Sequence, residues 1–542
     1  MNPPIQGFSL WVKKGLFSKG ARFWWIFFGL LVLGLGIRFH NLTEILVGGR
    51  FYFVDADCYS RMSRAQRISE APGTVVRHQD FENWPEGVVS HATAPFDYAI
   101  VGLERIVRWT WPQSGRFAVL RESTLDLAGA LVSPLIGLLT CVFLAAWSAG
   151  FRGGEHAPAW WAVPLLAAVS PPLVHATVFG RPDHQSLLLL FLAVAVGAEQ
   201  RMQSAPSRGW AWAGGLAWGG ALWVSLYEPL VLLGTVFLLG LLFWRPSWTG
   251  HVRLHWGAGL LVPLVSGWLV DGIRIVPPDS RWKEVLVRWG STIGELHKVD
   301  NVGRLSDWTG VLIWIVPPGL LWLARREGRV VLGWLVMLLV TAGLTLWQAR
   351  WSPYFALVFL FCLPPFFSLV SSPRRLGFAF LVSLWPVITE WESRLFPDAR
   401  TSEHRYMERS ERINTRLAAE RMRSPERLPF IAAWWHSPSL AYWSGQPAVS
   451  GSGHEGISGI FDAAHFFLST TPEEALEILR RRGVRLVVAS DSARAVENSS
   501  VILGRSAVEK PMAEWLWQSN LSEVWGLEGE GNVTTFRVLR VR

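Results

Sequence analysis

Cysteine, charge and nucleotide-binding motifs are all scarce in this sequence. The three cysteines among its 542 residues, Cys58, Cys141 and Cys362, lie far apart, so we expect neither a disulfide framework nor a cysteine-based metal site. Charged residues make up 17% of the chain, which is less than a soluble protein of this length would carry. The chain has no Walker-type Gly-Lys-Ser/Thr loop and no convincing Rossmann signature, so no motif indicates a nucleotide site.

Hydrophobic sequence, by contrast, is abundant. Apolar residues make up 50% of the chain, and the mean hydropathy is +0.26. Hydropathy indicates about 11–13 segments long enough to cross roughly 30 Å of hydrocarbon. The clearest are residues 23–37, 127–147, 160–178, 187–196, 210–226, 230–244, 256–270, 311–323, 330–346, 354–370 and 376–388. We therefore predict a polytopic α-helical membrane domain over residues 1–392.

Basic residues gather in every second loop between these apolar runs. Examples are Arg201 with Arg208, Arg325 with Arg326, and Arg374 with Arg375. The positive-inside rule places such loops in the cytoplasm. The net charge of +9 then reflects orientation and contact with anionic membrane lipids rather than nucleic-acid binding. We predict a multi-pass protein of the inner (cytoplasmic) membrane, with external loops that include residues 39–95 and 271–308.

The composition changes after about residue 392, where charge rises and apolar runs shorten to strand length. Residues 393–429 are predicted to be a charged helical linker, and residues 430–542 an extracytoplasmic soluble mixed α/β domain. Residues 472–482 are typical of a helix with Thr471 or Thr470 as its N-cap. Residues 484–489 are typical of a buried strand.

Two acidic groups on the predicted outer face are candidate functional residues. Asp55 and Asp57, two positions apart, can offer oxygen ligands to a hard divalent cation. A solvated loop acid is the alternative interpretation for Asp57. Asp183 stands directly before an apolar run, where an ionisable group is costly and often functional. The alternative there is a helix N-cap whose carboxylate accepts backbone N–H bonds.

Two further residues of that face carry charge. Glu295 has apolar neighbours in a long external loop, which suggests that the loop packs against another part of the protein. Arg350 breaks the positive-inside pattern, and a guanidinium at the outer end of a span is a candidate phosphate ligand. Snorkelling beside interfacial Trp347 and Trp351 is the alternative.

Taken in order, these motifs resemble the catalytic subunit of oligosaccharyltransferase in its single-subunit bacterial and archaeal form, a GT-C membrane glycosyltransferase. Residues 57–59 (DCY) are similar to the family's metal-binding Asp-x-Tyr, and residues 180–185 (GRPDHQ) to its Gly-x-x-Asp-His-His. Residues 434–436 (WWH) are similar to its Trp-Trp-Asp motif. The resemblance extends over nearly the whole chain.

The resemblance implies a role for each candidate residue. Asp57 and Glu295 would be catalytic, and Arg350 would bind the donor pyrophosphate. The ligands of a divalent metal, Mg²⁺ or Mn²⁺, would be Asp57, Asp183, Gln185 and Glu295, and the acceptor would contact Trp434, Trp435 and His436. The implied reaction transfers a glycan from a polyprenyl-pyrophosphate donor to an asparagine of an acceptor polypeptide outside the cytoplasm, with the chain acting as a single subunit.

Two departures from the family pattern keep an alternative open. Gln185 stands where the family has a second charged or imidazole ligand, and His436 replaces the Asp that recognises a sequon hydroxyl. The alternative is a lipid-linked-sugar glycosyltransferase of the same fold that acts on a hydroxyl, a lipid or another glycan. A relative that has lost its activity is a further alternative. A transporter or flippase is disfavoured, because we expect no charged residues buried in mid-span and no paired broken spans.

Overall fold

The computed structural model describes residues 20–110, 124–150, 159–244, 250–272, 280–370, 372–506, 508–518, 523–528 and 534–541. Residues 273–279 of the predicted external loop 271–308 lie outside this set. The chain divides into two compact units. The helical unit comprises Met1–Thr43, Ala130–Gly272 and His297–Pro397, and the mixed unit comprises Glu44–Gly129, Ile273–Leu296 and Asp398–Arg542.

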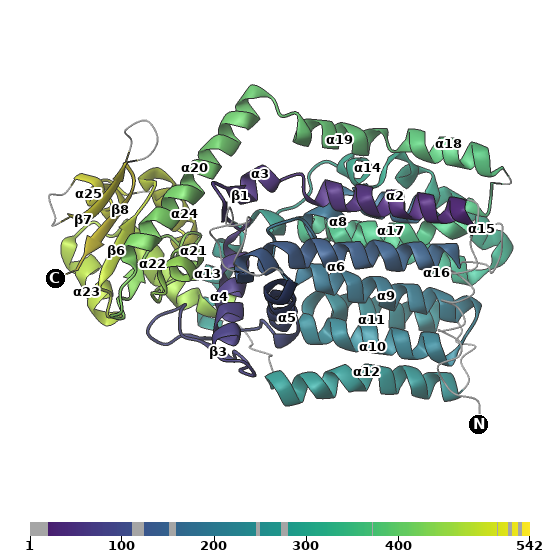
Figure 1. Ribbon diagram of the computed structural model, residues 1–542, viewed down its shortest axis with the longest axis horizontal. Coiled ribbons are helices and arrows are strands. Elements are labelled where there is room, and N and C mark those ends of the chain that lie inside the picture. The colour runs from purple at the N-terminus through teal and green to yellow at the C-terminus, as the bar shows by residue number, and fades with distance from the viewer. Residues whose placement is uncertain are drawn as a thin grey trace. The chain divides into compact units, whose positions relative to one another are not determined.

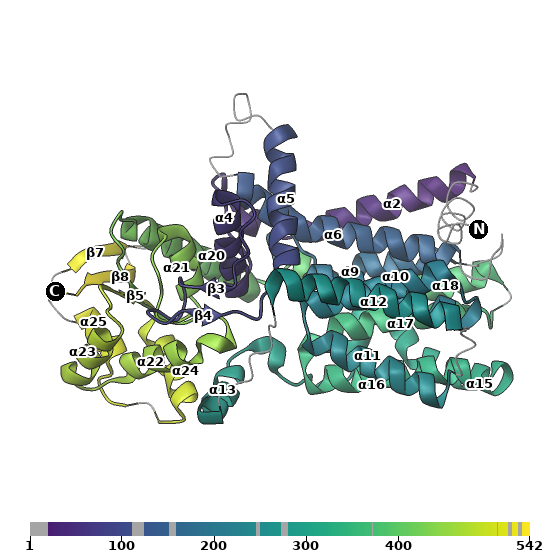
Figure 2. The same cartoon turned by 90° about the horizontal axis from the view of Figure 1, so that it is seen from below.

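The helical unit is a bundle whose longer helices run roughly side by side (Figures 1 and 2). Its α-helices are α2 (Ala21–Arg38), α6 (Thr124–Ala149, which begins in the mixed unit), α7 (Ala162–Val169), α8 (Pro171–His175), α9 (Gln185–Ser204), α10 (Arg208–Val224), α11 (Tyr227–Leu242), α12 (Gly250–Asp271), α14 (Arg304–Thr309), α15 (Val316–Glu327), α16 (Arg329–Trp347), α17 (Ser352–Phe367), α18 (Pro373–Ser383) and α19 (Trp385–Leu395). Two 3-10 turns, η4 (Val311–Trp314) and η5 (Ala349–Trp351), join them.

Each predicted apolar run falls on helix, but three runs are divided. The run 160–178 breaks at Ser170 into α7 and α8, the run 311–323 into η4 and α15, and the run 376–388 into α18 and α19. Proline stands at the first or second position of α8, α15 and α19. Proline lacks a backbone N–H, but the first N–H groups of a helix have no partner within the helix, so proline is tolerated where a new helix starts.

Four helical segments among the described residues are long and apolar enough to cross a membrane. They are Ala21–Ile45, Thr124–Ala149, Arg329–Trp347 and Ala349–Phe367, and α11 is a shorter apolar helix. In Ala349–Phe367, 89% of the residues in the apolar 18-residue stretch are buried inside the protein, whereas in Ala21–Ile45 only 22% are. The segment that follows Arg350 is therefore the most enclosed of the four. The total of 11–13 spans stays a prediction.

Close helix packing in this unit depends on glycine. A Cβ atom on Gly215 of α10 would lie 2.2 Å from the carbonyl oxygen of Trp256 in α12, so only a residue without a side chain allows this approach.

The bundle also contains a buried acid. Glu199 of α9 accepts hydrogen bonds from the indole N–H groups of Trp218 (3.2 Å) and Trp256 (2.9 Å). Glu199 lies three residues beyond the predicted apolar run 187–196, so it is an ionisable residue buried near the end of a span. The two indole donors satisfy the carboxylate.

The mixed unit contains three small sheets and several helices. Its helices are α4 (Ala56–Glu70), α5 (Ala94–Thr110), η2 (Ser280–Trp282), α13 (Lys283–Gly290), η3 (Gly294–Leu296), α20 (Ala399–Met422), α21 (Ser437–Ser444), η6 (His454–Gly456), α22 (Ile457–Leu468), α23 (Pro472–Arg481), α24 (Ser492–Leu503) and α25 (Met512–Gln518), and α3 (Leu42–Ile45) joins the two units. Two-stranded antiparallel sheets pair β1 (Leu46–Val47) with β2 (Arg50–Phe51) and β3 (His78–Gln79) with β4 (Val88–Val89).

A four-stranded sheet forms the centre of the C-terminal part. Its order is β5 (Phe430–Ile431), β6 (Leu486–Ala489), β8 (Thr534–Arg540) and β7 (Glu523–Glu528), with β5 and β6 parallel and the other pairs antiparallel (Figure 1). All four residues of β6 are buried. The strand expected at 484–489 and the helix expected at 472–482 are both present. The hydroxyl of Thr471 accepts from the backbone N–H of Glu474, as its predicted N-cap role requires.

Candidate functional site

Asp57 lies in the first turn of α4 in the mixed unit, and its side chain is exposed. The helix begins there because the carboxylate of Asp55 accepts the backbone N–H of Cys58 at 3.0 Å. Asp55 is therefore a helix cap. Asp57 also affects His91 electrostatically. Burial lowers the pKa of His91, but the negative charges of Glu455 and Asp57 raise it, and the net result is a pKa above the ordinary value.

A buried ion-pair network fixes α4. Asp97 of α5 is 0% exposed and accepts from Arg61 at 3.0 Å and from Arg64 at 2.8 Å. Arg64 also donates to the side chain of Gln79 (3.0 Å) and to the carbonyl oxygen of Ala92 (3.1 Å). The helix that carries Asp57 is thus tied to β3 and to the segment that leads into α5.

Glu295 belongs to η3, also in the mixed unit, and is half-buried. Ile293, two residues earlier, packs against the hydrophobic core of this unit, so the prediction that this loop packs against the protein is confirmed. Trp289 of α13 meets Trp434 edge to face, with ring centroids 5.7 Å apart. This contact links the segment that carries Glu295 to the Trp434–His436 motif.

Trp434, Trp435 and His436 directly precede α21. The two indole rings are perpendicular with centroids 5.9 Å apart, and both indole N–H groups are buried without a hydrogen-bond partner among the described residues. Nε2 of buried His436 lies 3.1 Å from Oε1 of Glu411 in α20. Glu411 also accepts from Arg494 at 3.2 Å. Two unsatisfied donors and a carboxylate therefore lie around residue 436, where a hydroxyl or an amide of a ligand has partners for both its donor and its acceptor.

Sequence reasoning did not find Glu411. Burial alone would raise the pKa of its carboxyl, but the hydrogen bond and charge of His436, with the charge of Arg494, lower it below its usual range. The carboxylate is thus held ionised beside the imidazole. Glu411 is one of many charged residues in α20, and nothing in the local sequence separates it from its neighbours.

Asp183 and Gln185 belong to the helical unit. Asp183 is buried, with Oδ1 2.7 Å from Nδ1 of His184 and Oδ2 3.7 Å from the guanidinium of Arg181. The residue before α9 is His184, and no side-chain hydrogen bond caps the helix. His184 already has helical backbone angles, so Asp183 directly precedes the first helical residue, and its N-cap role stays a prediction.

Arg350 lies in η5 of the same unit and forms an ion pair with Glu228 at the start of α11. Its guanidinium also lies 5.4 Å from the ring centre of Tyr227. Trp351 is fully buried rather than interfacial, so this part of the snorkelling alternative is wrong. Sequence reasoning missed Glu228, although its place between two apolar runs, before Pro229, was a usable signal.

The residues predicted as metal ligands fall in both units: Asp57 and Glu295 in the mixed unit, and Asp183 and Gln185 in the helical unit. Three carboxylates and an amide oxygen are the donors that hard divalent cations such as Mg²⁺ and Mn²⁺ prefer. The donor set therefore fits such an ion in its chemistry.

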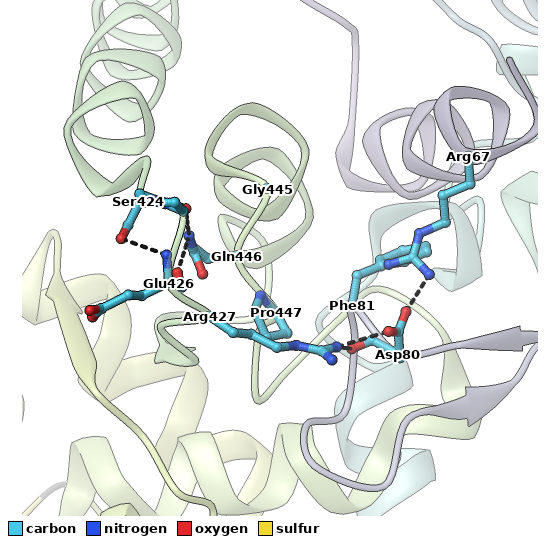
Figure 3. Close-up of a pocket in the computed structure, with 10 residues that line it drawn as sticks. Arg67, Asp80, Phe81, Ser424, Glu426, Arg427, Gly445, Gln446 and Pro447 are labelled. Carbon is cyan, nitrogen blue, oxygen red and sulfur yellow. Dashed lines mark hydrogen bonds and ion pairs between the residues drawn. The ribbon is translucent and has the colours of Figure 1, made fainter. Parts of the chain in front are cut away.

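One cavity of the mixed unit lies apart from these residues (Figure 3). Its volume is about 230 Å³, and it is lined by Arg67, Asp80, Phe81, Ser424, Pro425, Glu426, Arg427, Gly445, Gln446 and Pro447. Asp80 pairs there with both Arg67 and Arg427, the latter at 2.8 Å. None of the predicted functional residues lines this cavity.

Comparisons with known proteins give structural matches only. No protein-family model matches the sequence, and no curated protein matches it. Archaeal oligosaccharyltransferase AglB from Archaeoglobus fulgidus, in complex with an inhibitory peptide and a dolichol-phosphate, matches with a TM-score of 0.62 and 13% identity, over 90% of this chain and 72% of that chain. The oligosaccharyltransferase of the same organism, tethered to an acceptor peptide with an NVT sequon, matches with a TM-score of 0.62 and 14% identity, over 96% and 74%.

A second kind of enzyme has a similar fold. ArnT from Cupriavidus metallidurans, bound to undecaprenyl phosphate, matches with a TM-score of 0.55 and 14% identity, over 96% of this chain and 98% of that chain. An Archaeoglobus fulgidus oligosaccharyltransferase in complex with Zn and sulfate is also among the matches. The predicted fold class is confirmed: this chain is a multi-pass helical membrane protein with the fold of GT-C glycosyltransferases and a C-terminal mixed α/β part.

Proposed function

We propose that this chain transfers a glycan from a polyprenyl-pyrophosphate donor to an asparagine side chain of an acceptor polypeptide. The observation that carries the proposal is the likeness of fold, over 90% of the chain, to an oligosaccharyltransferase that binds a peptide and a dolichol-phosphate. The order of the motifs in the sequence adds support. We place the reaction and the mixed unit on the extracytoplasmic side of the inner membrane, because the basic loops face the cytoplasm.

The proposed roles follow from the chemistry of an amide nucleophile. An amide nitrogen is a poor nucleophile because its lone pair is conjugated with the carbonyl group. Asp57 and Glu295 accept its two N–H groups and weaken that conjugation, and Arg350 holds the pyrophosphate leaving group. When bound to Asp57, Asp183, Gln185 and Glu295, a divalent cation, Mg²⁺ or Mn²⁺, would offset the charge that develops on the pyrophosphate.

The acceptor hydroxyl has a candidate partner that replaces the missing aspartate. Glu411, held ionised beside His436, is a hydrogen-bond acceptor at this position, and the indole N–H groups of Trp434 and Trp435 are donors. We propose that these four residues bind the Ser or Thr of an Asn-x-Ser/Thr sequon. The carboxylate of Glu411 in α20 thus takes the place of the aspartate that His436 replaces in the motif.

A second candidate function is transfer of a lipid-linked sugar to a hydroxyl, a lipid or a glycan. The observation that favours it is the match to ArnT, which extends over 98% of that chain, whereas this chain covers 72% of AglB. The two candidates share the donor class and differ in the acceptor.

The deciding experiment is an in vitro transfer assay with the purified full-length chain, lipid-linked glycans extracted from its host, and fluorescent peptides. Transfer to an Asn-x-Thr peptide, but not to Asn-x-Ala or Gln-x-Thr peptides, supports the first function. Transfer to a lipid or glycan acceptor with no peptide product supports the second. Chelation with EDTA followed by Mg²⁺ or Mn²⁺ tests metal dependence. Transfer that persists in Asp57→Ala and Glu295→Ala proteins refutes the assigned roles.

A further inference from the structure

Three side chains of the mixed unit that have no role in the proposed transfer form a cluster, in which two imidazoles lie beside one carboxylate. His91 lies between β4 and α5, and His454 and Glu455 form the start of η6. Nδ1 of His91 lies 2.5 Å from Oε1 of Glu455, and Nδ1 of His454 lies 3.5 Å from Oε2. One possible ligand atom from each residue lies within 4.8 Å of the other two.

A second carboxylate lies behind this cluster. Glu82 is 3% exposed, and its Oε1 has no hydrogen-bond partner among the described residues. Burial raises the pKa of Glu82 to about 7, with the charge of Glu455 adding to the increase and that of His91 opposing it. Glu82 is therefore close enough to both residues to sense their charges.

Two glycines make room for these carboxylates. A Cβ atom on Gly451 would lie 2.5 Å from Oε2 of Glu82, and one on Gly453 would lie 2.7 Å from Oε2 of Glu455. Neither position accepts a side chain unless a carboxylate moves. The backbone of residues 451–456 is thus shaped around the oxygen atoms of both acids.

The donor set is that of a transition metal rather than of an ordinary ion pair. Two imidazoles with carboxylate oxygens are common ligands of Zn²⁺ and related divalent ions. Zinc bonds of about 2.0–2.2 Å in tetrahedral geometry put ligand atoms roughly 3.4 Å apart, so side-chain rotations are enough to close the cluster. Glu455 is 4% exposed while both imidazoles are partly exposed, so an ion enters from the solvent side. Its charge compensates two buried carboxylates that otherwise repel each other.

We propose that His91, His454 and Glu455 bind one divalent transition-metal ion of the Zn²⁺ class. The ion joins the segment between β4 and α5 to the start of α22, which are distant in the sequence. It fastens the first extracytoplasmic segment to the C-terminal part of the mixed unit. This site shares no residue with the metal assigned above to Asp57, Asp183, Gln185 and Glu295.

The test measures bound zinc and needs no glycan transfer, so its result does not depend on whether the proposed function is correct. The full-length protein is purified in detergent, stripped with a chelator and dialysed against ZnCl₂, and its zinc content is measured by mass spectrometry. The variants are His454→Gln and Glu455→Gln. The matched controls are His404→Gln and Glu408→Gln, which alter an exposed His–Glu pair of α20 with Nε2 and Oε1 3.4 Å apart. Asp183→Asn removes a ligand of the other metal.

We expect His454→Gln and Glu455→Gln each to lose one zinc equivalent per chain, with the rise in melting temperature that Zn²⁺ produces in the wild type also lost. The two control variants and Asp183→Asn should each retain the zinc equivalent bound at this site and the rise in melting temperature that it produces. The proposal is overturned if His454→Gln binds as much zinc as the controls, or if the stripped wild type takes up no zinc that depends on residues 91, 454 and 455. Because the side chain of His454 is partly exposed, this variant is decisive even if Glu455→Gln fails to fold.

Discussion

The pair of arginines on Asp97 offers the sharpest test of how the mixed unit is held together. Asp97 is fully buried, and Asp97→Asn keeps its shape but removes the charge opposite Arg61 and Arg64. Removing one partner of a buried ion pair costs about 3–5 kcal/mol, because the remaining charge stays desolvated. Asparagine still accepts one hydrogen bond, so we expect the lower end, about 3 kcal/mol. For a unit of this size that corresponds to a fall in melting temperature of roughly 6–12 °C.

Asp80→Asn is the matched control. Asp80 also pairs with two arginines, Arg67 and Arg427, but its side chain is 39% exposed, so we expect less than about 1 kcal/mol. Thermal unfolding of the detergent-solubilised proteins, followed by circular dichroism, gives both melting temperatures. If Asp97→Asn melts no lower than Asp80→Asn, burial does not set the cost of losing these ion pairs, and the reasoning is refuted.

Three further predictions concern single charges. Arg350→Ala should lower the transfer rate about 100-fold, as expected for removal of one donor to a developing anion. Glu228→Gln should lower the rate much less. Equal losses of rate in the transfer assay would instead indicate that the ion pair is only structural. Burial raises the pKa of Asp80, but its arginine partners lower it to below the ordinary 3.8, so the advantage in melting temperature over Asp80→Asn should be full at pH 7 and shrink only as the pH falls below 3.8. Glu411→Gln should raise the KM for a sequon peptide about tenfold with kcat unchanged, whereas Glu408→Gln, one turn earlier on α20, should not alter either constant.

The sequence predicted those features that depend on neighbouring residues. Apolar runs marked the helices of the bundle, because each helix in a membrane must present an apolar surface along its own length. The helix α23 and the strand β6 were found from a cap and from a short apolar run, and both signals lie within a few residues of the element itself.

The prediction that was wrong for Trp351 depended on tertiary contacts. Trp351 has the context of an interfacial tryptophan, but it is completely buried, and its ring lies 5.6 Å from that of Tyr227 in α11. A partner that is distant in the sequence overrides the local preference of the residue, and no single-sequence pattern reports such a partner.

The acids that sequence reasoning missed share one property. Glu228, Glu411 and Glu455 each lie beside a cation or an imidazole that is a candidate ligand-binding group: Arg350, His436 and His91 respectively. Each partner is distant in the sequence, so the pairs form only when the chain folds. The sequence motifs pointed to Arg350 and His436 but not to the acids beside them.

The ion pair between Arg350 and Glu228 affects which anions can bind to the arginine. An anion that approaches Arg350 meets the negative charge of Glu228 as well, and a singly charged group gains little by replacing one carboxylate with another. A pyrophosphate offers more oxygen atoms and more charge, and guanidinium binds it through two parallel hydrogen bonds. In the proposed function, the ion pair would keep the arginine oriented before the donor binds, and it would favour a polyanionic leaving group over a neutral or singly charged one.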